Sequence, residues 1–169
     1  LSSLDVTVIY FYTLIGMTCL YGGFWGLKIT NFTEANLSRQ ATRLQIAPTS
    51  KLKASLTGDL AAFICQYIAI VILLLYLYFG LGIGFGKQIG YILLMSAIGS
   101  YVGIVIGHLI GRLFHCQENT KTTILSSFSL FCSFLSGMMV VDLKYLIQEY
   151  VPILAYINPV NLITDGLYA

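Results

Sequence analysis

The feature that most constrains this chain is a set of four long apolar segments without Asp, Glu, Lys or Arg, over 6–27, 60–79, 89–111 and 122–141. A helix needs ~20 apolar residues to cross a bilayer, and each segment reaches that length. Charged residues make up 9% of the sequence, whereas a soluble domain has about a quarter. We therefore expect an all-α membrane protein: a polytopic helix bundle with four full spans in a single transmembrane domain, 1–169.

The loops between these segments differ in charge. Cytoplasmic loops of membrane proteins are enriched in Lys and Arg. With four spans, the loops after the first and third segments share one side, and this asymmetry predicts that they are cytoplasmic. Seven basic residues lie on that side and two on the other: Lys28, Arg39, Arg43, Lys51, Lys53, Arg112 and Lys121, against Lys87 and Lys144.

The C-terminal segment is apolar but interrupted. Pro152 and the pair Asn158-Pro159 break it, so no piece before Pro159 is long enough to span. We expect an outer re-entrant segment over 143–158, made of two short helices, and then the start of a further span. Asp165 is costly to bury alone, so it is expected at the outer surface or paired.

The loop after the first span contains the most informative polar segment, a helix predicted over 33–47. Thr33 or Asn31 would cap its start, and Glu34 would suit the positive end of its dipole. Leu37, Ala41 and Leu44 recur at helical spacing, whereas Arg39 and Arg43 fall largely elsewhere. Two interpretations stay open: the helix lies on the inner leaflet, or it docks into a partner protein.

The third apolar segment carries a glycine every fourth residue, at Gly99, Gly103, Gly107 and Gly111. Such a row lies along one side of a helix and lets a neighbouring backbone approach closely. We expect helix packing there, with sliding between helices as the functional alternative. His108 lies in the same segment and either satisfies a local hydrogen bond or serves transport.

Motifs for chemistry of the chain's own are missing from the sequence. It contains no phosphate-binding loop, no His-Glu-x-x-His and no nucleophile elbow. The four cysteines have no metal-like spacing, and no basic patch with interleaved aromatic residues suggests nucleic acid. We expect no catalytic, cofactor or metal site, so the chain is not itself an enzyme and energy for active work would come from a partner.

These features together resemble the membrane subunit of type-2 ABC exporters, the ABC type-2 permease family. The likeness covers nearly the whole chain and depends on three stretches: the loop end Arg43-Leu44-Gln45-Ile46-Ala47-Pro48-Thr49-Ser50, the small-residue span over 96–111, and the run Ile157-Asn158-Pro159-Val160-Asn161-Leu162-Ile163-Thr164-Asp165-Gly166-Leu167. The resemblance implies that 6–27 corresponds to the family's second span. It also implies that the family's first span and most of its last lie outside this sequence.

The resemblance further implies a multi-pass permease in a plasma membrane, and the frequent Ile, Lys and Asn favour a bacterial one. It would form a homodimer or a heterodimer with a second permease subunit. An ABC ATPase subunit would bind the ATP, and the helix over 33–47 would be the coupling helix. A membrane scaffold that binds a cytoplasmic partner without transporting is the alternative. The implied ATPase contacts are Glu34, Leu37, Arg39, Ala41, Arg43 and Leu44.

Overall fold

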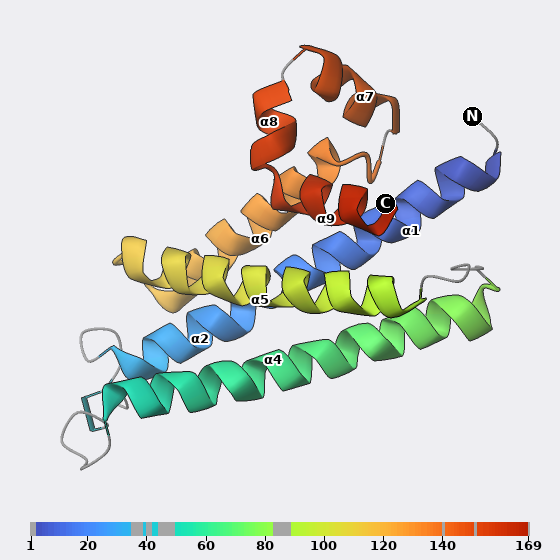
Figure 1. Ribbon diagram of the computed structural model, residues 1–169. Coiled ribbons are helices and arrows are strands. Elements are labelled where there is room, and N and C mark those ends of the chain that lie inside the picture. Colours follow the sequence, from blue (N-terminus) through green and yellow to red (C-terminus); the bar gives the residue numbers. More distant parts are fainter. Residues whose placement is uncertain are drawn as a thin grey trace.

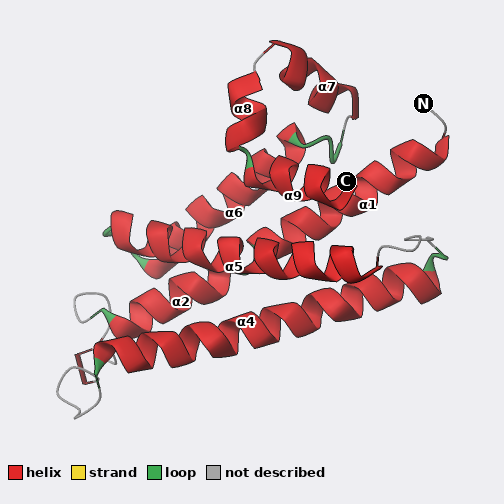
Figure 2. Cartoon of the chain, in the orientation of Figure 1, coloured by secondary structure: helices red, strands yellow, loops and turns green. Residues whose placement is uncertain are grey.

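The computed structural model describes residues 3–34, 39, 42–43, 50–82, 89–139, 141–150 and 152–168. Within these residues the elements are helical and no strand is present, as the sequence predicted (Figure 2). In chain order they are α1 (Ser3–Leu20), α2 (Gly23–Thr33), α4 (Lys51–Leu75), the π-helical turn η1 (Tyr76–Gly80), α5 (Ile89–Leu113), α6 (Glu118–Leu135), α7 (Val141–Tyr150), α8 (Pro152–Ile157) and α9 (Pro159–Tyr168).

Three helical stretches in the described part are long and apolar enough to cross a membrane: Thr7–Thr33, Leu52–Gly80 and Ile89–Leu113. All three extend beyond the predicted boundaries. The first continues past Lys28 to the end of α2, because Lys28 is exposed at the helix surface and does not interrupt the backbone. The start of the helix expected over 33–47 is therefore wrong, since Thr33 closes α2 and Glu34 is extended.

The fourth predicted span corresponds to α6, which runs over Glu118–Leu135 and not over 122–141. It ends where the N–H groups of Gly137 and Met138 bond the carbonyls of Phe134 and Ser133, a Schellman motif. Gly137 has φ +90°, which is accessible to glycine and strained for other residues. With its many hydroxyl side chains, α6 is not among the three stretches that qualify as spans in the described residues.

The long helices place the two predicted cytoplasmic loops at the same end of the bundle (Figure 1). There α2 ends, α4 begins, α5 ends and α6 begins, and we call this the basic end. The short helices α7 and α8 lie away from this end, beyond the end of α6, and α9 packs against the middle of α1 and α5 (Figure 1). Helix α5 contacts α1 and α2 most extensively and also touches α4, α6 and α9, so it forms the centre of the bundle.

Helix α5 packs against α1 and α2 almost backbone to backbone along its glycine row. A Cβ on Gly103 would overlap the carbonyl of Cys19, and a Cβ on Gly107 would overlap the carbonyl of Gly23 and lie 2.7 Å from its Cα. Gly99 faces Cys19 and Ile163, and Gly111 faces Thr30. The whole row, from Gly99 to Gly111, thus lies against the first span.

The first span is interrupted at Tyr21-Gly22, between α1 and α2. The N–H of Gly22 bonds the Cys19 carbonyl, so the Thr18 carbonyl is left outside the regular helix pattern. The buried amide of Gln66, on α4, donates to this Thr18 oxygen at 2.7 Å. A polar side chain from the neighbouring span thereby satisfies a carbonyl that lipid could not.

In the C-terminal segment the chain divides at Pro152 and Pro159, the residues at which the sequence predicted breaks. Asn158 caps α9: its Oδ1 accepts from the N–H of Val160 at 3.0 Å, while its Nδ2 donates to the Cys132 carbonyl at 2.8 Å. Asp165 is paired, because the buried ammonium of Lys144 lies 2.5 Å from its Oδ1.

Candidate functional site

A polar junction lies at the basic end, where α2, α4, α5 and α6 meet. The segment over 35–49 leaves the end of α2 and returns to the start of α4, so these helices are its two legs. Helix α5 carries His108 and Arg112 one turn apart, and residues four apart lie on the same face of a helix. Each makes contact with a leg.

His108 contacts both legs at once. Its Nδ1 lies 2.7 Å from Oγ1 of Thr30 on α2, and its Nε2 lies 2.8 Å from Oδ1 of Asp59 on α4. The Thr30 hydroxyl also bonds the Gly26 carbonyl at 3.0 Å. The carboxylate oxygen of Asp59 can only accept, so Nε2 is the donor in that contact, whereas the direction of the contact between Nδ1 and Thr30 depends on the ring tautomer. The imidazole therefore links three helices.

Arg112 forms the second contact, with its Nε 3.0 Å from Oε1 of Glu34. The two side chains are 60% and 36% exposed, so the pair contributes at most about 1 kcal/mol. The pair instead holds the end of α2 against α5, because Glu34 is the residue at which the chain leaves α2. Glu34 thus lies at the C-terminal end of α2. Residues 35–38 lie outside the described part, so its position at the start of the next helix stays a prediction.

Lys121 completes the junction from α6. It is 1% exposed, and its Nζ donates to the Gly111 carbonyl at 2.8 Å and to Oδ1 of Asn31 at 3.4 Å. Carbonyls in the last turn of a helix have no intrahelical partner and attract cations. Lys121 therefore caps the C-terminal end of α5 and joins it to α2 and α6.

We expect Lys121→Met to lower the unfolding free energy of the protein in detergent by about 1–3 kcal/mol, because the buried Gly111 carbonyl loses its donor. Thermal unfolding followed by circular dichroism measures the change. Lys53→Met is the matched control, because Lys53 is an exposed lysine at the same end of the bundle. Equal stability of the two variants would contradict the capping role.

The structure describes only some of the other predicted site residues. Arg39 and Arg43 are helical and exposed, so both are accessible to a partner. Leu37, Ala41 and Leu44, the predicted apolar contacts, lie outside the described residues. The glycine row ends in the junction, because Gly111 packs against Thr30.

Sequence reasoning missed Thr30 and Asp59, considered Asn31 only as a helix cap, and treated Lys121 as a loop charge. One sequence signal was present for Asp59 and His108: each lies near the basic end of its apolar run, so both have a similar depth in the membrane. No periodicity marks Lys121, because its burial depends on where the end of α5 arrives.

Comparison with known families agrees with this architecture. Residues 2–169 match the family described as ABC-2 family transporter protein. The chain belongs to this family. The resemblance seen in the sequence is thereby confirmed, and the protein is a transmembrane transport permease built as a helix bundle. No curated protein and no solved structure matches the chain.

Membership of the ABC-2 family implies an ABC ATPase partner and a membrane around the bundle. In that setting the exposed faces of the helices differ. Helix α4 exposes an aliphatic stripe suited to lipid, whereas the first span and α6 expose aromatic and polar side chains. The α4 stripe comprises Leu56, Leu60, Ile64, Ile68, Ile72 and Leu75; the other faces comprise Tyr10, Trp25, Lys28 and Phe32, and Thr123, Ser127, Phe128, Phe131 and Phe134.

Proposed function

We propose that this chain is the permease subunit of an ATP-driven exporter and that the segment between Glu34 and Ser50 docks on a separate ABC ATPase subunit. The ATPase would bind the ATP, and the permease would have no enzymatic activity or cofactor of its own. The observation that carries the proposal is the junction: one helix, α5, contacts both legs of the docking segment through His108 and Arg112.

The junction offers a route for movement from the ATPase into the membrane. Thr30 and Asp59 on the two legs are joined through the buried His108, so a displaced segment would pull on α5. Helices α2 and α5 touch through Gly23 and Gly107 and would move together. The break at Tyr21-Gly22 is the point in the first span where α2 can turn relative to α1.

The pathway would lie where two permease subunits meet, in a homodimer or with a second permease. The exposed face of α6 supports this location, because it carries the hydroxyl groups of Thr123 and Ser127 and lipid favours apolar side chains. The aliphatic stripe of α4 would face lipid. The excess of basic residues at the end away from α7 and α8 supports placing that end in the cytoplasm, as in a bacterial plasma membrane.

Co-purification tests the proposal. The full natural protein is expressed with candidate ATPases and purified in detergent, as wild type and as Arg39→Glu plus Arg43→Glu. We expect the wild type to retain the ATPase in stoichiometric amount and the double variant to lose it, because two exposed cations become anions on the docking segment. Lys53→Glu, on α4 at the same end, is the control and should retain the ATPase.

Two outcomes would contradict the exporter. If no ATPase co-purifies with the wild type, the docking role fails. If an ATPase binds but its hydrolysis rate does not depend on the permease in proteoliposomes, a non-transporting scaffold explains the binding better.

A further inference from the structure

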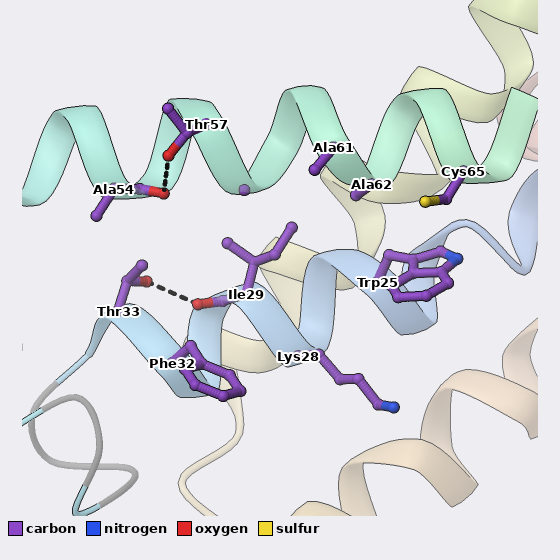
Figure 3. Close-up of a pocket in the computed structure, with 11 residues that line it drawn as sticks. Trp25, Lys28, Ile29, Phe32, Thr33, Ala54, Thr57, Ala61, Ala62 and Cys65 are labelled. Atoms are coloured by element: carbon purple, nitrogen blue, oxygen red, sulfur yellow. Dashed lines mark hydrogen bonds between the residues drawn. The ribbon is translucent and has the colours of Figure 1, made fainter.

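A groove of about 550 Å³ lies on the bundle surface between α2 and α4, near the basic end (Figure 3). Its α4 wall consists mainly of small residues, including Ala54, Gly58 and Ala61. Its α2 wall includes the exposed aromatic rings of Trp25 and Phe32. The long side chains of the α4 stripe point to other sides of that helix, so the groove is open along its length and almost entirely apolar.

Lys28 places a positive charge at the α2 edge of this apolar groove. Its exposed side chain extends from α2 away from α4, and its Nζ lies 5.9 Å from the centre of the Trp25 ring (Figure 3). Among the ion pairs between described residues, none includes Lys28. It lies five residues before the end of α2, roughly 8 Å along the helix axis.

An ammonium group at this depth needs an anionic partner. A charged side chain inside the apolar part of a membrane is costly unless it reaches a headgroup or another charge. Anionic phospholipids are concentrated in the cytoplasmic leaflet, and basic pockets between spans on that side bind their headgroups. The groove combines this charge with an apolar channel beside it.

We propose that the groove is a binding site for an anionic phospholipid of the inner leaflet. The lipid phosphate pairs with Lys28, and an acyl chain lies between the aromatic wall of α2 and the small residues of α4. The inference requires that the basic end faces the cytoplasm, and it does not depend on ATP-driven transport.

Trp25 is the only tryptophan of the sequence and lines the groove, so tryptophan fluorescence reports what occupies the groove. The full protein is placed in phosphatidylcholine vesicles that contain increasing fractions of brominated phosphatidylglycerol or brominated phosphatidylcholine. Bromine quenches tryptophan on contact. A Trp25→Phe sample is subtracted to remove any fluorescence from outside this sequence.

We expect the phosphatidylglycerol to quench Trp25 at a roughly fivefold lower mole fraction than the phosphatidylcholine. This is about the factor by which one lysine near the membrane surface favours an anionic lipid over a neutral one. Lys28→Gln should abolish the difference. Lys28→Arg keeps the charge and should preserve it, which separates charge from folding. Lys53→Gln removes a lysine outside the groove and should also preserve it.

Three results would overturn the proposal. Equal quenching by the two lipids shows that the groove does not select an anion. A preference that survives Lys28→Gln assigns the selection to another residue. Absence of quenching by both lipids shows that protein, such as a second copy of the chain, covers the groove.

Discussion

Replacement of Gly107 by alanine is expected to separate α5 from α2 and to destabilise the protein by about 3 kcal/mol or more. The added Cβ would overlap the Gly23 carbonyl and lie 2.7 Å from the Gly23 Cα. Both neighbours are backbone atoms, so no side chain can rotate to make room. The measurement is the thermal unfolding transition in detergent, together with the yield of folded protein.

Gly90→Ala is the matched control, because Gly90 lies in the same helix and a Cβ there would meet no atom within 4 Å. Alanine has the higher helix propensity, so this variant should be as stable as the wild type or slightly more stable. If both variants unfold at the same temperature, α5 and α2 do not approach as closely as the structure has them.

Replacement of His108 by leucine is expected to uncouple the permease from its ATPase without releasing the ATPase. The variant removes the side chain that joins Thr30 to Asp59 and leaves the carboxylate of Asp59 without its partner. Arg39 and Arg43 remain accessible, so the ATPase should still co-purify. We expect the permease-dependent part of ATP hydrolysis to fall about tenfold, which corresponds to about 1.4 kcal/mol of coupling free energy.

A double-mutant cycle makes this prediction specific. Asp59→Asn combined with His108→Leu should cost no more than His108→Leu alone, because both changes break the same contact. Arg112→Gln is the graded control: it breaks an exposed pair with Glu34 and should change hydrolysis less than twofold, about 0.4 kcal/mol. Additive losses in the cycle would show that His108 does not act through Asp59.

The path of the chain through the bundle was largely predictable because it depends on local composition. A run of ~20 residues without charge has to form a helix in lipid, where every backbone group must be satisfied. The glycine period in α5 likewise predicted a smooth helix face. Helix ends were less predictable: Lys28 stands inside the first span because an exposed lysine can occupy a helix surface without ending the helix.

The candidate junction was not predictable in this way, because it consists of contacts between residues far apart in the sequence. Thr30 and His108 are 78 residues apart, and Asp59 and His108 are 49 apart. Each is an ordinary polar residue near the edge of an apolar run, so no local pattern distinguishes it from a residue that faces headgroups. Their meeting requires the close approach of α2 and α5 through the glycine row.

The sequence by itself determined that this chain is a membrane helix bundle, which end of it is basic, and the family to which it belongs. Those properties follow from charge, apolar length and short motifs, which are read along the chain without knowing which segments meet in space. Only the tertiary structure decided that Lys121 caps α5, that α5 contacts both α2 and α4 at the basic end, and that Lys28 lines a groove beside α4. These depend on the relative positions of packed helices, because a hydrogen bond or a groove wall exists only after two distant segments have met.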